Sequence, residues 1–599
     1  MNKNKISLLA VAVALGLTGC WQKEIDRAPP SSKPEKPEYE LPARQGELMR
    51  LATAPIAGQV TGMVVRDDSL LMNVKHPNSN ATGEVPITAG VITQFANLDL
   101  RQIDVDFDNS SWPTTAGERQ TLWSTFAGLE IIAEVAEDGL GDIQYVVDKD
   151  GEAELSDELE SNVLLVADDG TQILYTAWDD NPGAISRLLL DKNDQVLDTE
   201  LVDLSGVAGT AGVRKGNLTP WGTPLFAEHG ATETGSEAPT LTDWNKPLEQ
   251  EDAALPIRSE SDIADRLDAY LGEGEFPNPY RYGYMMELTN PEGEVSVEKR
   301  FAMGRFEHDS AMIMPNGTTV YLGQGGIGGV LYKFEADSAN ELRSGTLYAA
   351  KVHQDIPYNH PSLVSFDVEW IELGRATDAE VEGWIADFDG IDMDDYVEGQ
   401  SSYLTNADVL AWSVGASHYP SVAEGGNPTT AGLAMDDRVV FLETRQAAKF
   451  LGASAEWSNM SGLTFNTERA AQAQYGSSAL DEDVTQAYAY FAIPTLSHQM
   501  VWAFGDIQLT TDTGYCGMVY RMPIDDNFEI NRIEPALFGD KKYPDHNEAN
   551  GRCHRDSPAQ PSELVVMDDG RVLVAEEFTA LNQGGHQNAA VWLYDPYKE

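Results

Sequence analysis

The chain has 599 residues, of which 97 are acidic and 40 are basic, and its formal net charge at pH 7 is −57. Proteins bind nucleic-acid backbones through patches of Lys and Arg, so this composition excludes nucleic acid as a partner. Hydrophobic residues make up 42% of the chain, which is enough for a large folded core.

The N-terminus has the pattern of a bacterial lipoprotein signal. Two lysines precede an apolar run over residues 6–17, and a small-residue pattern follows that ends in Cys20. The run is too short for a membrane span, which takes ~20 apolar residues. We therefore predict a signal peptide at 1–19 and Cys20 as the lipidated first residue. Trp21 in the next position indicates an outer-membrane lipoprotein that faces the periplasm or the cell surface.

A proline-rich stretch follows the lipidation site and cannot form a core. We predict a tether over 20–44 and a single domain over 45–599. An insertion is expected at about 233–275, whose polar first part could be a lid or a surface loop. In its second part, a helix-capping pattern begins at Ser259 and an apolar stripe follows. Together they predict a short amphipathic helix.

Short hydrophobic runs recur along the domain after turn signals, a pattern typical of a β-propeller with one such strand in each blade. Their spacing is too irregular to fix the number of blades. The predicted strands are Ser69–Val74, Gln172–Tyr175, Thr318–Leu322, Arg438–Leu442, Ala487–Phe491 and Arg571–Ala575.

One segment combines two strands with a charged turn. A strand near Tyr282–Leu288 leads to the turn Gly304–Asp309, which holds four ionisable groups in five residues, and a second strand follows. An Arg, an imidazole and two carboxylates so placed could serve a metal and an anion together, or could form a solvated turn.

These motifs resemble those of the PhoX-type alkaline phosphatases. The turn Gly-Arg-Phe-Glu-His-Asp resembles the Gly-Arg-Phe-x-His-Glu of that family, with Asp309 in place of the Glu. The resemblance spans roughly residues 45–597 and implies an all-β fold, a six-bladed propeller with long inserted loops and a few short helices, closed by strands from both termini. The other matching segments are Thr219–Thr223, Thr444–Ala448, Ala455–Trp457, Pro561–Leu564 and Asp569–Val572.

The resemblance also implies a site with two iron and three calcium ions. The positions that correspond to metal ligands are Glu228, His229, Asp309, Glu456, Glu563 and Glu577. Calcium prefers such carboxylate oxygens. Ala227 replaces a Cys of the family, so iron is in doubt unless His229 compensates as a nitrogen ligand.

Three further residues are candidates for substrate binding and catalysis. Arg305 and Arg445 could clamp the phosphate oxygens or form salt bridges between blades. His308 could hold a ligand carboxylate or be a buried hydrogen-bonded histidine.

The resemblance implies a phosphatase that hydrolyses phosphate monoesters at a calcium, or iron-calcium, cluster. From the lipoprotein pattern we expect it outside the cytoplasm, held at the membrane through Cys20 alone, and we expect a monomer. Two alternatives stay open. One is a non-catalytic, calcium-stabilised surface propeller that binds a glycan or a protein, and the other is a calcium-dependent propeller lactonase.

Two cysteines remain after Cys20. Cys516 and Cys553 would lie in an oxidising compartment, where a disulfide between them is possible.

Overall fold

The computed structural model divides the chain into two units, residues 1–41 and 42–599. The residues that it describes run from 46 to 598, except for 79–85, 105–108, 136–138, 140–155, 168, 230–240, 242–243, 247–259, 273–275, 477–479, 481–483, 503, 511–515, 540–552, 555 and 578–587. The predicted signal peptide, Cys20, the tether and most of the first part of the insertion lie outside this range. No helix among the described residues is long and apolar enough to cross a membrane.

Three four-stranded antiparallel sheets follow one another along the first half of the domain, each with its strands in sequence order. The first consists of β2 (Gln59–Val65), β3 (Ser69–Lys75), β4 (Val91–Ala96) and β5 (Gly128–Glu134). The second consists of β6 (Leu159–Val166), β7 (Gln172–Trp178), β8 (Ala184–Leu190) and β9 (Val196–Leu201). The third consists of β10 (Val213–Leu218), β11 (Pro224–Glu228), β12 (Met285–Thr289) and β13 (Ser296–Arg300).

The next sheet has nine strands and contains two meanders that meet at β19 and β24. One meander consists of β14 (His308–Ile313), β15 (Thr319–Gln324), β17 (Leu331–Ser338), β18 (Glu341–Gln354) and β19 (Phe366–Thr377). The other consists of β21 (Ser461–Phe465), β22 (Ala487–Ile493), β23 (Met518–Ile524) and β24 (Arg532–Phe538). A separate strand pair joins β16 (Ile327–Gly329) to β20 (Trp457–Ser458).

The last sheet unites the two ends of the described domain. Its strands are β25 (Pro561–Val566), β26 (Val572–Glu576), β27 (Ala590–Asp595) and β1 (Glu47–Thr53). β1 pairs antiparallel with β27, so that Glu47 lies opposite Asp595 and Thr53 opposite Ala590. Pairing of the first strand with the last closes a propeller ring without free edges at the junction, and the predicted closure by both termini is confirmed.

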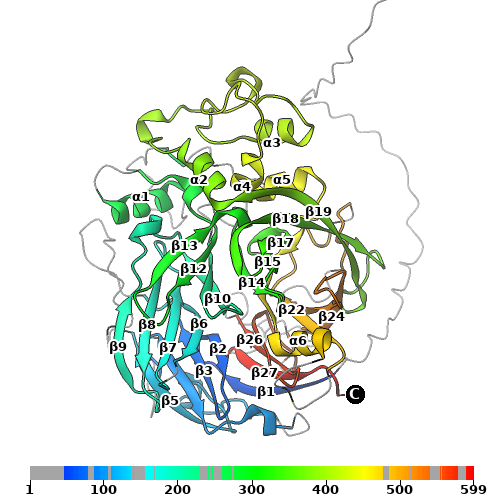
Figure 1. Cartoon of the computed structure of the whole chain (residues 1–599). Helices are drawn as coiled ribbons and strands as arrows, with labels where there is room; N and C mark the ends of the chain where they lie inside the picture. The colour runs from blue at the N-terminus through cyan, green and yellow to red at the C-terminus, as the bar shows by residue number, and fades with distance from the viewer. Residues whose placement is uncertain are drawn as a thin grey trace, which may run out of the picture. The chain divides into compact units, whose positions relative to one another are not determined.

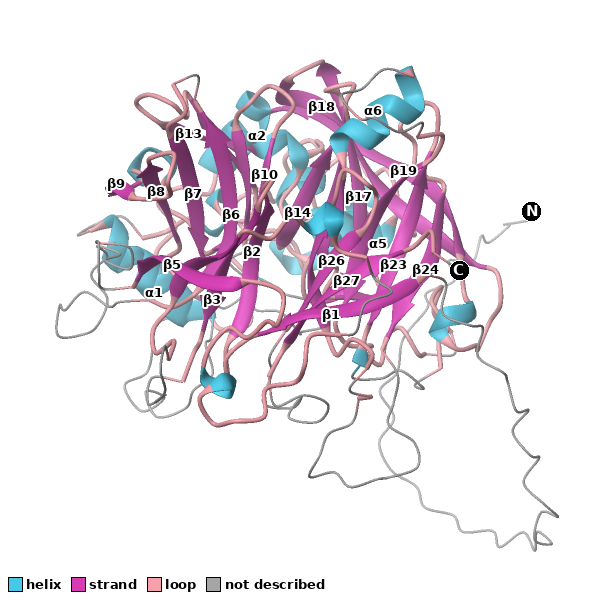
Figure 2. Ribbon diagram, turned by 90° about the horizontal axis from the view of Figure 1, so that it is seen from below, coloured by secondary structure: helices cyan, strands magenta, loops and turns pink. Residues whose placement is uncertain are grey.

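The first strand of each sheet or meander lies innermost. β2, β6, β10, β14, β21 and β25 contact one another in this order, and β25 contacts β2 again. Figure 2 shows β2, β6, β10 and β14 side by side near the middle of the ribbon. The fold is therefore an all-β propeller, as predicted. Because two of the meanders share one continuous sheet, the number of six blades stays a prediction.

Helices are few and lie mostly beside the nine-stranded sheet. Contacts join α2 and α5 to β19, and Figure 1 shows the helical segment beyond β18 and β19. The helices are α1 (Glu260–Leu271), α2 (Asp378–Ala386), α3 (Asn406–Ser413), α4 (Arg438–Leu442), α5 (Thr444–Phe450) and α6 (Thr467–Tyr475).

Five of the six predicted strands are confirmed and one is wrong. The confirmed runs correspond to β3, β7, β15, β22 and β26, each of which is the second strand of its sheet or meander. The run Arg438–Leu442 is instead the helix α4, and all five of its residues are buried. A short apolar run has no periodicity that separates a buried strand from a buried helix. The amphipathic helix of the insertion is confirmed as α1.

Candidate functional site

Charged side chains from several sheets meet where the inner strands pass one another. We call Lys75, Glu160, Lys215 and Glu563 the central tetrad. They lie at the end of β3, near the start of β6, in β10 and in β25, and each is less than 10% exposed. Such buried charges require partners, and here each group has one of opposite sign.

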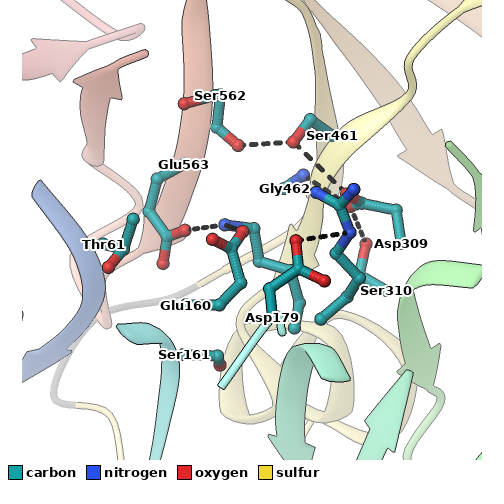
Figure 3. A network of polar contacts seen from close by, with 12 residues as sticks. Thr61, Glu160, Ser161, Asp179, Asp309, Ser310, Ser461, Gly462, Ser562 and Glu563 are labelled. Atoms are coloured by element: carbon teal, nitrogen blue, oxygen red, sulfur yellow. Dashed lines mark hydrogen bonds and ion pairs between the residues drawn. The ribbon is translucent and has the colours of Figure 1, made fainter. Parts of the chain in front are cut away.

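Within the tetrad, Lys215 lies between two carboxylates. Its Nζ is 3.2 Å from Oε1 of Glu160 and also contacts Oε2 of Glu563. Nζ of Lys75 contacts the other oxygen of Glu160, and Figure 3 shows Glu160 and Glu563 side by side in this network. Burial alone would raise the pKa of Glu160, but Lys215 and Lys75 hold it well below its ordinary value. Glu160 is therefore ionised, whereas burial raises the pKa of Glu563 although Lys215 acts to lower it.

Two ion pairs flank the tetrad. Nε of Arg214 lies 3.2 Å from Oδ2 of Asp179, and Nε2 of His229 lies 3.0 Å from Oε1 of Glu307. Burial would lower the pKa of His229, but the Glu307 carboxylate raises it overall. The pKa of Asp179 is raised by burial in spite of Arg214.

Asp309 connects the tetrad to the neighbouring meander. Its Oδ2 accepts hydrogen bonds from Ser310 Oγ at 3.0 Å and from the Gly462 backbone N–H at 3.1 Å, and Ser461 Oγ lies 3.4 Å from Oδ1 (Figure 3). Burial raises its pKa to about 6, although Lys215 and Arg214 act to lower it. Asp309 is thus a predicted ligand that faces the same cluster as Glu563.

Glu577 also belongs to this region. It follows β26 directly, is half-buried, and its pKa is raised by burial against the opposing effect of Lys75. Asp309, Glu563 and Glu577 are therefore the predicted ligands that the structure brings into one electrostatic cluster.

Glu228 and Glu456 have other partners. Glu228 ends β11 and forms a buried ion pair with Lys299, 2.9 Å from Nζ to Oε1, while its Oε2 accepts from the Gly283 N–H. Glu456 accepts from the backbone N–H groups of Asp506 and Ile507 at 2.9–3.1 Å. Neither contact tests a metal role, which stays a prediction for both.

Arg305 donates hydrogen bonds to three backbone carbonyl groups. Nε lies 3.0 Å from the Tyr282 carbonyl oxygen and 3.2 Å from that of Pro279, and Nη1 lies 3.2 Å from that of Leu442. These bonds tie the charged turn to the segments around it.

His308 is fully buried and stacks on Phe306 with 3.6 Å between ring centroids. Its Nε2 lies 3.0 Å from the Gly304 carbonyl oxygen, and burial lowers its pKa to about 3. A neutral imidazole in an apolar stack corresponds to the buried hydrogen-bonded histidine among the two predicted interpretations.

Arg445 has a buried donor nitrogen that makes no hydrogen bond to the described residues. Nε donates to the Gly328 carbonyl at 2.8 Å, and a Cβ added to Gly328 would lie 2.5 Å from Nη2. Nη1 is buried and has no hydrogen-bond partner among the described residues. Burial lowers the pKa of Arg445, which indicates incomplete compensation of its charge.

A group outside the predicted set could hold a metal ion. His76, Asp157 and Glu158 offer one ligand atom each within 4.8 Å of one another, at the end of β3 and just before β6. His76 Nε2 lies 3.0 Å from Oε2 of Glu158, so an imidazolium ion pair also satisfies this geometry.

A cavity of about 560 Å³ opens along the inner strands and reaches Lys215 and Glu563. Polar side chains of successive inner strands line it, among them Asn162, Asn217 and Thr464. Two members of the central tetrad, Lys215 and Glu563, therefore border this cavity.

The sequence interpretation missed Lys75, Glu160, Arg214 and Lys215. Their common signal is a charged residue within or beside an otherwise strand-like segment. A charge buried inside a strand indicates a paired, inward-facing group, and that signal could have found them.

One family model matches a long central part of the chain. The model of the family "Alkaline phosphatase PhoX" matches residues 162–468, just over half of the chain. This chain belongs to the PhoX family of alkaline phosphatases. No curated protein matches it.

Solved structures with similar folds share little sequence with this chain. A Pseudomonas fluorescens PhoX in complex with vanadate, a transition-state analogue, is 14% identical, with a TM-score of 0.41 over 92% of this chain and 86% of that one. A luciferin-regenerating enzyme is 8% identical, with a TM-score of 0.32 over 92% and 95% of the two chains. A putative oxidoreductase (glucose dehydrogenase) from Thermus thermophilus is 11% identical, with a TM-score of 0.30 over 92% and 100%.

The side chains fit the two implied metals differently. Among the residues that the structure describes, no thiolate is present to hold iron, because Ala227 is buried where the family has a Cys, and Cys516 and Cys553 form a disulfide. Calcium takes carboxylate oxygens, and around Lys75, Arg214 and Lys215 carboxylates outnumber basic side chains by two to one. These carboxylates are Glu158, Glu160, Asp179, Asp309, Glu563 and Glu577. The carboxylates therefore suit calcium, the thiolate that would favour iron is missing, and His229 is the nitrogen donor that remains.

Proposed function

We propose that this chain hydrolyses phosphate monoesters on the face of the propeller around Arg214, His229 and Arg445. Membership of the alkaline phosphatase family supports this proposal, and the matched residues include all three side chains. The observation that carries it is the buried Nη1 of Arg445, which has no partner among the described residues. A guanidinium with a free donor is well suited to a phosphate oxygen.

In this proposal Arg445 binds and orients the phosphate. The Gly328 carbonyl fixes Nε, and the close approach of Gly328 to Nη2 limits movement of the group, so the guanidinium is positioned before substrate arrives. His229 and Glu307, which form an ion pair on this face, could hold or move a proton beside the substrate.

Calcium would be held by carboxylates that lie outside the tetrad, namely Asp179, Asp309 and Glu577. When bound, it would neutralise the phosphate charge and lower the pKa of a water molecule. A metal of this kind offsets the repulsion between an anionic substrate and a chain with a net charge of −57.

We further propose that the mature protein is a monomeric outer-membrane lipoprotein, anchored only through Cys20. Its substrate would then be a small phosphate ester outside the cytoplasm. The lipoprotein pattern before Cys20 supports this location.

The test is hydrolysis of 4-nitrophenyl phosphate by the chain without residues 1–20, compared between the unmodified protein and Arg445→Met. The variant should lose ~10²-fold in kcat/KM, the usual effect of removing one donor to a developing charge.

Arg438→Met is the matched control. Arg438 is similarly buried, but its donors are taken by Asp436 and Asp387, so its replacement should leave kcat/KM unchanged. Full activity in Arg445→Met, or no hydrolysis by the unmodified chain, would reject the proposal.

A second candidate is a non-catalytic propeller that binds a glycan or a protein. It is favoured by the ion pair of Glu228 with Lys299 and by the loss of the thiolate at Ala227, because both change positions to which the resemblance gives metal ligands. In that case the chain would hydrolyse no phosphate ester under any metal condition and would still fold.

A further inference from the structure

In the central tetrad, lysine ammonium groups bridge carboxylates in the way that a metal ion would. Lys215 contacts one oxygen of Glu160 and one of Glu563, and Lys75 contacts the other oxygen of Glu160. A divalent cation between these carboxylates would make the same bridges.

The tetrad also ties separate parts of the propeller together. Lys75 comes from β3, Glu160 from β6, Lys215 from β10 and Glu563 from β25, which belong to four different sheets. β25 comes from the C-terminal part of the chain, so the tetrad connects the first three sheets to the sheet that closes the ring.

The charges of the tetrad balance. Two carboxylates face two ammonium groups, and all four side chains are buried. Removal of Lys215 would leave two buried carboxylates beside a single ammonium, which is unfavourable unless another cation enters.

We propose that the ammonium of Lys215 takes the place of a divalent cation between Glu160 and Glu563. Glu563 is a position to which the family resemblance gives a metal ligand, but in this chain its carboxylate contacts an ammonium. The chain consequently binds fewer metal ions than the resemblance implies. This inference does not depend on phosphatase activity, because the Lys215 ammonium could replace a metal ion in an enzyme and in a non-catalytic propeller alike.

Diffraction from crystals of the unmodified chain soaked in terbium chloride tests the first half of the proposal. Terbium occupies calcium sites and has strong anomalous scattering. We expect no anomalous peak between Glu160 and Glu563, and a peak there would overturn the proposal.

Metal counting with Lys215→Ala tests the second half. After dialysis against calcium, this variant should retain one more ion per chain than the unmodified protein, with a dissociation constant of about 10⁻⁴ M or lower. Calcium should also raise its melting temperature by several degrees more than that of the unmodified chain.

Two further variants serve as controls. Lys215→Ala with Glu563→Gln lacks one of the two carboxylates and should return to the ion count of the unmodified chain. Lys299→Ala exposes the single carboxylate of Glu228, whose Oε2 accepts from the Gly283 and Tyr284 N–H groups, and should gain no ion.

An equal ion count in Lys215→Ala and the unmodified chain would contradict the proposal. If Lys215→Ala folds only in calcium, that requirement itself supports the added ion. If Lys215→Ala folds neither with nor without calcium, the terbium experiment on the unmodified chain decides: a peak between Glu160 and Glu563 overturns the proposal, and no peak there supports it.

Discussion

Lys299 and Glu228 form an ion pair that is closed to water, with 2.9 Å between Nζ and Oε1 and side chains that are 1% and 0% exposed. Lys299 lies in β13 and Glu228 at the end of β11, so the pair crosses β12, which separates these strands in the sheet. Burial lowers the pKa of Lys299 even though Glu228 acts to raise it. The pair therefore depends on both partners.

Lys299→Met should destabilise the domain strongly. The variant leaves the Glu228 carboxylate buried without a counter-charge, and breaking such a pair costs about 3–5 kcal/mol. Urea denaturation of the two proteins measures the difference. The double variant with Glu228→Gln should recover most of this loss, and a single-variant loss below ~1 kcal/mol would contradict this interpretation.

Glu443 should make stability fall as the pH rises. Burial raises its pKa from 4.5 to about 7, although Arg305 and the Tyr280 hydroxyl act to lower it. The folded state therefore holds a proton that the unfolded state releases, so the stabilisation is complete below pH 4.5 and is lost between pH 4.5 and 7.

Glu443→Gln removes this titration. Its stability should depend less steeply on pH over that window, with a difference of order ~1–3 kcal/mol between the two proteins across it. Thermal unfolding at a series of pH values measures this. Parallel pH profiles for both proteins would show that Glu443 does not titrate there.

The disulfide between Cys516 and Cys553 should stabilise the closing part of the propeller. It joins residues 37 positions apart, one just before β23 and the other before β25, so that β23 and β24 lie within the closed loop. Closing a loop of this length in the unfolded chain is worth about 4 kcal/mol in the chain-entropy model. The Cys516→Ser, Cys553→Ser double variant should lose that amount in denaturant titrations, and a reductant should affect only the unmodified chain.

Arg305→Lys should lower stability without changing substrate affinity. Lysine cannot reproduce the bonds to the Tyr282, Pro279 and Leu442 carbonyl oxygens, which hold the charged turn. We expect a lower melting temperature and an unchanged KM for a phosphate monoester. A large rise in KM at unchanged stability would instead identify Arg305 as a phosphate-binding group.

The sequence predicted the second strands of the sheets, which are mainly hydrophobic, and missed the inner strands that line the centre. β3 and β26 are apolar over most of their length, and all of their side chains are buried. β10 contains Arg214 and Lys215, and the polar residues that make it part of the site also break the hydrophobic pattern.

The family motifs predicted some of the carboxylates of the site, but neither Glu160 nor the two lysines. Asp309, Glu563 and Glu577 were identified through family motifs, and the structure places them in one cluster. Lys75 and Lys215 lie outside those motifs, and their partners are separated from them by 85 and 348 residues. Pairing over such separations depends on the closure of the ring, which a local pattern does not encode.

The most direct test of the proposed function is hydrolysis of 4-nitrophenyl phosphate by the chain without residues 1–20, first after chelation and then after calcium is restored. We predict that chelation abolishes turnover and that calcium alone, without ferric iron, restores it. No turnover in calcium, in iron or in both together, from a chain that remains folded, would contradict phosphatase activity and leave a binding propeller.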